Sequence, residues 1–124
     1  MIDIIVLTLL LALIQIWLLP MLLSLKNMDY LVSNRDEPVA GSVVLGRVKR
    51  ASANLQESLP VFLALAVLAI HQSVDLVTVA SAWLALRGAY LAIYAFGITV
   101  IRSVVWVGSV ACLVYMALAI AGIL

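Results

Sequence analysis

The chain has 124 residues, of which 67% are hydrophobic and only 10% charged, and its net charge is +1. A soluble domain is typically about 45–50% apolar and about 25% charged, and a chain this short cannot bury so much apolar surface in its own core. The composition therefore excludes an ordinary soluble domain, the charge argues against a nucleic-acid partner, and we expect an all-α integral membrane protein.

The first predicted membrane helix covers residues 3–25, an apolar stretch bounded by Asp3 and Lys26. It begins with an acidic residue and is longer than the apolar run of about 7–15 residues in a signal peptide, so we expect a permanent span and not a cleaved leader. Pro20 predicts a kink, which membrane helices tolerate.

Three more apolar stretches predict three more spans, because a membrane helix needs about 20 largely apolar residues. They cover residues 51–71, 75–98 and 102–124. From Leu76 to Ile101 only Arg87 is charged, and no residue after Arg102 is. The four spans leave little chain for anything else, so we treat residues 1–124 as a single membrane domain.

Basic residues predict the orientation of these spans. The loop between the first two spans contains Lys26, Arg35, Arg47, Lys49 and Arg50. Arg102 lies between the third and fourth spans, whereas the outer loop HQSVD (71–75) and both termini have no Lys or Arg. The positive-inside rule places the basic loops in the cytoplasm and both termini outside it.

Polar residues at helical spacing mark one face of the second predicted helix. Arg50, Asn54 and Glu57 are four and three residues apart, which places them on one face, and Arg47 extends that face by a turn. A charge inside the bilayer costs at least about 2.5–3.5 kcal/mol on insertion scales, so such residues are candidates for function.

The third predicted helix carries a matching face. Arg87, Tyr90 and Tyr94 are three and four residues apart, and Arg102 opens the fourth helix at the same side of the membrane. All these side chains fall in the cytoplasmic half at overlapping depths. They predict a polar pocket that opens to the cytosol.

Two interpretations of these residues stay open. Glu57 and Arg87 can form an internal ion pair that fixes helix register, with the other basic residues and tyrosines acting as interfacial anchors. Alternatively the residues line a binding pocket. Four arginines against one glutamate leave positive charge in excess, which favours an anion-binding pocket.

The chain offers no nucleophile and no metal-ligand set of its own. Cys112 is the only cysteine and lies within a span, and His71 has no partner at ligand spacing. A bound cosubstrate must therefore bring the reactive atom. A guanidinium favours a nearby thiolate, so a small anionic thiol fits, with an apolar second substrate arriving from the lipid.

These motifs resemble a known family. The run RVKRASANLQESLPVF (47–62) resembles the second-helix signature of the MAPEG superfamily, the membrane-associated proteins in eicosanoid and glutathione metabolism. The run RGAYLAIY (87–94) and Arg102 at the start of the fourth helix are also similar. SNRDEP (33–38) and GITVIRSVVW (97–106) resemble the bacterial, mostly uncharacterised branch, and the resemblance spans nearly the whole chain.

The resemblance implies a left-handed four-helix bundle assembled as a homotrimer, with glutathione as cosubstrate bound at the cytosolic side between subunits. It implies that glutathione is held by Arg47, Arg50, Asn54, Glu57, Arg87, Tyr90 and Tyr94. Arg102 and Tyr94 are then the catalytic residues, with Arg102 stabilising the thiolate. The bacterial branch implies a location in the inner (plasma) membrane.

Three functions follow as hypotheses. The first is a glutathione-dependent transferase or peroxidase of the microsomal type that acts on lipid-soluble electrophiles, and Arg102 and Tyr94 favour it. The second is a non-catalytic protein that binds a lipid or an anion, mildly favoured by Ser58, where leukotriene synthases have tyrosine. The third is a structural bundle or assembly partner.

Lys26 or Arg35 is the candidate for the basic contact that the end of helix one supplies in some members of the family.

Overall fold

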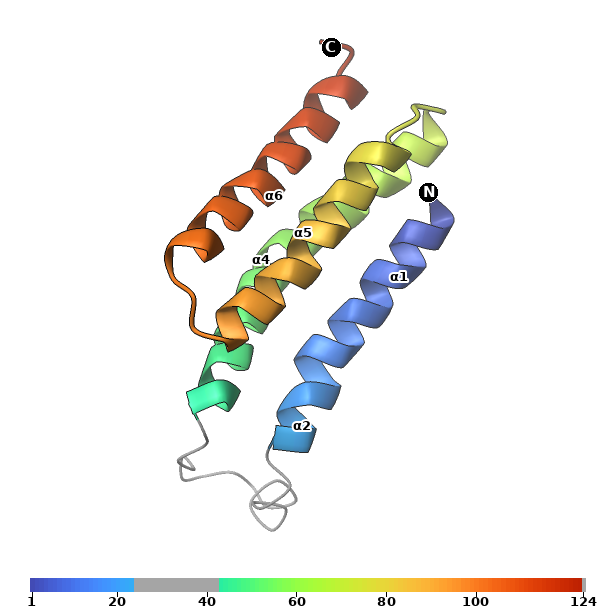
Figure 1. Cartoon of the computed structure of the whole chain (residues 1–124). Helices are drawn as coiled ribbons and strands as arrows, with labels where there is room; N and C mark the ends of the chain where they lie inside the picture. The colour runs from blue at the N-terminus through green and yellow to red at the C-terminus, as the bar shows by residue number, and fades with distance from the viewer. Residues whose placement is uncertain (24–42, 124) are drawn as a thin grey trace.

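A computed structural model describes residues 1–23 and 43–123, and the regular structure in these two ranges is entirely helical (Figure 1). The elements are α1 (Ile2–Leu13), η1 (Ile14–Leu18), α2 (Leu19–Leu23), α4 (Val43–His71), α5 (Val77–Ala95) and α6 (Val100–Ile120). The all-α prediction is confirmed for this part of the chain. Lys26, Arg35 and the run SNRDEP lie outside the described residues.

The first helical segment contains a π-helical turn. α1, η1 and α2 follow one another without a break, and the Leu19 N–H donates to the Ile14 carbonyl five residues earlier. Pro20 comes directly after this turn. A proline lacks an N–H and crowds the carbonyl four residues before it, so the helix there departs from α geometry. The irregularity that Pro20 predicts takes the form of this wider turn.

The helices have the length and surface of membrane spans. Three described segments are long and apolar enough to cross a bilayer: Leu45–His71, Val77–Ala95 and Val100–Ile120. A shorter apolar segment covers Ile2–Leu18. Large apolar side chains such as Trp17 and Val100 face outward, as a lipid-facing surface requires. The protein is therefore an integral membrane protein, and α4 begins at Val43, before the predicted second span at 51.

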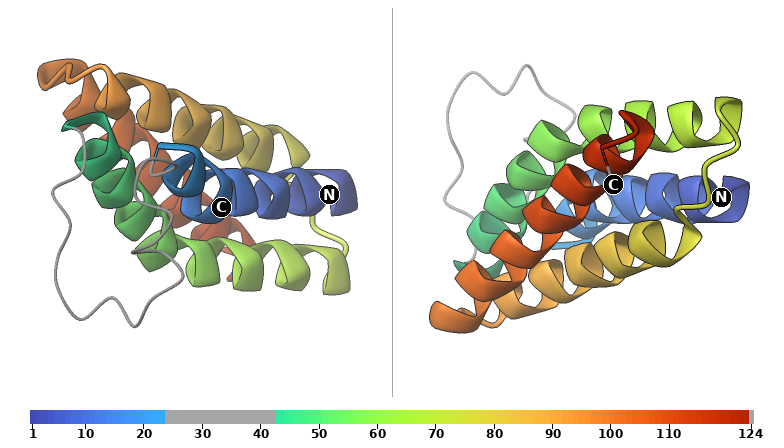
Figure 2. Two further views of the ribbon diagram at one scale, coloured as in Figure 1. Left: turned by 90° about the horizontal axis from the view of Figure 1, so that it is seen from below. Right: turned by 90° about the horizontal axis from the view of Figure 1, so that it is seen from above.

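The helices are arranged so that both termini lie at one end of the bundle. The turn between α4 and α5 lies at that end too, and the connection between α5 and α6 lies at the other (Figure 1). α1 and α6 each pack against both α4 and α5, and the views from below and above show α1 lying between α4 and α5 (Figure 2). Termini on one side are what four membrane crossings require.

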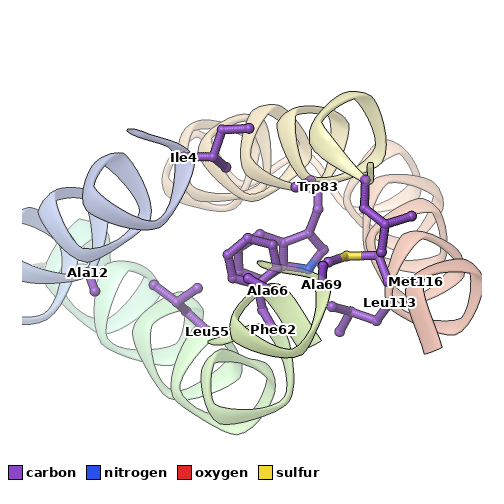
Figure 3. Packing of buried hydrophobic residues seen from close by; sticks show 11 residues of the cluster. Ile4, Ala12, Leu55, Phe62, Ala66, Ala69, Trp83, Leu113 and Met116 are labelled. Atoms are coloured by element: carbon purple, nitrogen blue, oxygen red, sulfur yellow. The ribbon is translucent and has the colours of Figure 1, made fainter. Parts of the chain in front are cut away.

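The core joins α4 to α5 through two aromatic rings. Phe62 and Trp83 stack with their centroids 4.0 Å apart and their planes within 6° (Figure 3). Ala66 and Ala80 are fully buried beside them, and such small residues let helices approach closely. Met116 from α6 closes the cluster. This stack fixes the register of α4 against α5 and hence the relative depth of the polar residues on each.

Candidate functional site

Three helices meet at Tyr94. The Arg50 Nε on α4 donates a hydrogen bond to the Tyr94 hydroxyl on α5, with 3.1 Å between nitrogen and oxygen. The Arg102 guanidinium, from the first turn of α6, lies with its carbon 4.6 Å from the centroid of the Tyr94 ring. A cation held this close to an aromatic face is attracted by the ring's negative charge density. The structure thus brings together three of the residues that the sequence singled out.

The same pattern continues one turn deeper along α5. Tyr90 meets Tyr94 edge to face, with 5.6 Å between ring centroids and 63° between planes. The Arg87 guanidinium carbon lies 4.7 Å from the Tyr90 ring centroid. Arg87 is only 2% exposed, and its Nε and Nη2 have no hydrogen-bond partner among the described residues. The two tyrosines therefore lie between Arg87 on one side and Arg50 and Arg102 on the other.

A cavity of about 360 Å³ opens beside these tyrosines. It is lined by Asn54, Tyr90, Arg102, Ser103, Trp106 and Val107. Its volume falls in the range of about 300–1,000 Å³ that small-molecule pockets occupy. The lining includes one guanidinium, an amide, a phenol and a hydroxyl but no carboxylate, so the wall favours an anion and can donate several hydrogen bonds to it.

Three lining residues from α6 were not predicted from the sequence. Ser103, Trp106 and Val107 look like ordinary residues of an apolar span, and only their spacing relates them to the site. Trp106 follows Arg102 by four residues, about one helical turn, so helical spacing predicts that both side chains share one face of α6. Trp106 and Val107 are also 42% and 58% exposed, so the cavity is open at this wall.

The other predicted residues lie around the cavity and not on its wall. Arg87 is buried beside Tyr90, while Arg50 and Glu57 are exposed. Arg47 donates from Nη1 to the carbonyl of Ala95 at the end of α5. In the part of the chain that the structure describes, Glu57 forms no ion pair with Arg87. The internal-pair interpretation of these two residues is therefore not what the structure shows.

The geometry defines a class: a polytopic α-helical membrane protein with a cluster of arginines and tyrosines beside a cavity, near the end of the bundle opposite its termini. The chain matches the model of the MAPEG family over residues 4–122, nearly its whole length, and thus belongs to the MAPEG family. Neither the curated proteins nor the solved structures contain a significant match to it.

Proposed function

We propose that the protein binds glutathione at this cavity and uses its thiolate against a lipid-soluble electrophile or hydroperoxide. The observation that supports this most directly is the position of Arg102. Its guanidinium lies against the ring of Tyr94, whose hydroxyl accepts a hydrogen bond from Arg50, and it also lines the cavity. Members of the MAPEG family generally use glutathione, and this cavity suits its anionic groups.

The groups around the cavity complement glutathione. The tripeptide has two carboxylates, an ammonium group and a thiol. Arginines clamp carboxylates with paired N–H donors, which suits the exposed Arg50 and the Arg102 of the cavity wall, and the buried Arg87 adds positive charge beneath them. Glu57 can accept a hydrogen bond from the ammonium group, and the Asn54 amide can donate or accept. The tyrosines add phenolic donors, and Tyr94 is the nearest of them to Arg102.

Arg102 would hold the thiol as a thiolate. A guanidinium within a few ångströms lowers a thiol pKa, and the N-terminus of α6, where Arg102 lies, adds partial positive charge. The thiolate then attacks an electrophilic carbon, the new C–S bond forms, and the displaced electron pair leaves with the leaving group. With a hydroperoxide, two glutathiones reduce the O–O bond and yield an alcohol, water and glutathione disulfide.

A second copy of the chain would complete the site. Glu57 lies within the membrane-length part of α4 and is exposed in the single subunit. An ionised carboxylate facing lipid is costly, so another protein surface should cover it. We place glutathione between neighbouring subunits of a homotrimer, in the plasma membrane of a bacterium, with the cavity at the cytoplasmic side and both termini outside.

One observation also favours a second function, the binding of an anionic lipid without chemistry. The cavity combines Arg102 with Trp106 and Val107, two exposed apolar side chains of α6. A charged head group beside the arginine and an acyl chain along α6 would fill such a site. Ser58, in place of the tyrosine of leukotriene synthases, is compatible with this alternative.

Two measurements separate the functions. Isothermal titration of the detergent-solubilised protein with glutathione should show saturable binding, and a conjugation assay with a generic electrophile should show turnover. Binding of glutathione without turnover on any electrophile or hydroperoxide would favour a non-catalytic role. Absence of glutathione binding, together with co-purified anionic lipid, would support the lipid-binding alternative and overturn the proposal.

A further inference from the structure

Arg47 lies against the end of α5 and not in the cavity. Its Nη1 donates to the carbonyl oxygen of Ala95, the last residue of α5, over 3.4 Å. Its guanidinium also lies flat against Gly97: a Cβ added there would be 2.8 Å from the Arg47 Cζ and 2.9 Å from both terminal nitrogens. Such distances leave no room for a methyl group, so Gly97 makes the space that Arg47 fills.

The end of α5 has an ordered structure that Arg47 completes. Gly97 has a φ of +77°, its N–H donates to the Tyr94 carbonyl, and the Ile98 N–H donates to the Ile93 carbonyl. These two bonds are the Schellman motif that ends many helices with a left-handed glycine. The Ala95 carbonyl is paired with the cationic side chain of Arg47, and a cation is favourable at the partially negative end of a helix.

This helix end is close in sequence to both groups at the centre of the site. Tyr94 immediately precedes Ala95, and Arg102 belongs to the first turn of α6, which starts at Val100. Only residues 96–99 connect the two helices, so their path determines where Arg102 lies relative to the Tyr94 ring. α4 therefore contacts this region through two side chains one turn apart. Arg47 donates a hydrogen bond to the backbone carbonyl of Ala95, and Arg50 donates one to the Tyr94 hydroxyl.

We infer that Arg47 is a positioning residue for the thiolate: it fixes the connection between α5 and α6, and so keeps the Arg102 guanidinium against Tyr94 and the cavity. Its effect on bound glutathione passes through Arg102 and involves no direct contact with the tripeptide. The inference rests on the proposed function, because it concerns the thiol that Arg102 would ionise. The docking of Arg47 on α5 is itself independent of any ligand.

Two substitutions disturb this contact from opposite sides. Arg47→Ala removes the guanidinium, whereas Gly97→Ala keeps the charge and places a methyl group where the guanidinium lies. The clash involves the far end of a flexible side chain, so Gly97→Ala should displace Arg47 and not unfold the bundle. Gly122→Ala is the matched control, since Gly122 also has a left-handed φ, of +79°, and a Cβ there meets nothing within 4 Å.

Two measurements are made on the detergent-solubilised protein. The first is amide hydrogen exchange over residues 96–103 without ligand, and the second is the pH titration of bound glutathione, followed by the ultraviolet absorbance of its thiolate. Arg47→Ala and Gly97→Ala should both speed exchange in that segment and raise the thiol pKa by about one, the scale of a weakened charge contact. The double variant should show no larger change in exchange rate or thiol pKa than either single variant. Arg47→Lys should change both quantities less than Arg47→Ala does, and Gly122→Ala should match the wild type in both.

Some results would overturn the inference. Weaker glutathione binding in Arg47→Ala, with wild-type binding and thiol pKa in Gly97→Ala, would make Arg47 a direct ligand contact. Unchanged exchange over 96–103 in both variants would show that Arg47 does not hold the connection. If the wild type itself fails to ionise glutathione, the proposed function fails, and the exchange experiment still decides whether Arg47 docks on α5.

Discussion

At the scale of single residues, Tyr94 connects most of the site. Its hydroxyl accepts from Arg50 and its ring lies beneath Arg102, while its edge meets Tyr90. Each contact comes from a different helix or turn, so Tyr94 sets the distance between the arginines on α4 and α6. The guanidinium carbons of Arg50 and Arg102 lie 5.8 Å and 4.6 Å from the Tyr94 ring centroid, so an anion bound beside this ring would be attracted by both charges.

The first prediction concerns the two exposed charged residues Arg50 and Glu57 of α4. Arg50→Ala and Glu57→Ala should each weaken glutathione binding roughly tenfold or more, since a hydrogen bond to a charged group contributes about 1.5–3 kcal/mol. Both side chains are exposed in the subunit, so its melting temperature should change little. Titration calorimetry measures the affinity and a thermal melt measures the stability. A large drop in the melting temperature of Glu57→Ala with unchanged glutathione affinity would show that Glu57 has only a structural role.

At the scale of helices, the stack of Phe62 on Trp83 sets the register on which the site depends. The Trp83 side chain is fully buried between α4, α5 and α6, and its Nε1 has no hydrogen-bond partner within the described ranges. The ring is therefore held by packing alone. Arg50 and Tyr94 meet about three turns further towards the other end of the same helix pair.

The second prediction tests this packing. Trp83→Ala should destabilise the protein by about 3–5 kcal/mol, because it removes a large buried side chain and leaves a cavity. Trp83→Phe should cost far less, since it keeps a ring for the stack with Phe62. Trp17→Ala is the control, as Trp17 is 71% exposed. Thermal unfolding in detergent measures all three, and equal losses for Trp83→Ala and Trp17→Ala would contradict this account.

The sequence predicts some parts of the site better than others. Helical spacing and depth bring Arg50, Tyr94 and Arg102 to the same end of the bundle, where the structure shows them in contact. Helical spacing does not predict which residues line the cavity and which lie around it. Periodicity shows which residues share a helix face, but not which residues of other helices they contact. Arg47 shares a face with Arg50, yet α5 ends at Ala95, level with Arg47, so this arginine meets a helix end. Trp106 carries no charge and is indistinguishable by composition from a lipid-facing residue.

At the scale of the whole molecule, the third prediction concerns orientation. The termini and the α4–α5 turn share one end of the bundle (Figure 1), and the positive-inside rule places that end outside the cytoplasm. In a Cys112→Ala background, Ser73→Cys should react with an impermeant thiol reagent added outside intact cells. Glu37→Cys, in the basic loop, should react only after permeabilisation, and the reverse pattern would show that the orientation is wrong.

The fourth prediction concerns assembly. Gly88, Ala89, Ala92 and Ala95 give α5 a stretch of small residues, and a Cβ added at Gly88 meets nothing within 4 Å. Small residues of this kind allow another helix to approach closely. Together with the exposed Glu57, they lead us to expect a homotrimer. Native mass spectrometry from detergent should show a predominant trimer, and a monomer or dimer as the main species would count against shared sites between subunits.

The proposed catalysis depends above all on the ionisation of bound glutathione by Arg102. A free cysteine thiol has a pKa near about 8.5, so little thiolate is present at neutral pH without assistance. The most direct test is the thiolate absorbance of the wild type and of Arg102→Leu with saturating glutathione at about pH 7. We predict a strong signal in the wild type that disappears in Arg102→Leu while binding is largely kept, with turnover lost in parallel. No thiolate signal in the wild type would contradict the enzymatic account and favour the lipid-binding alternative.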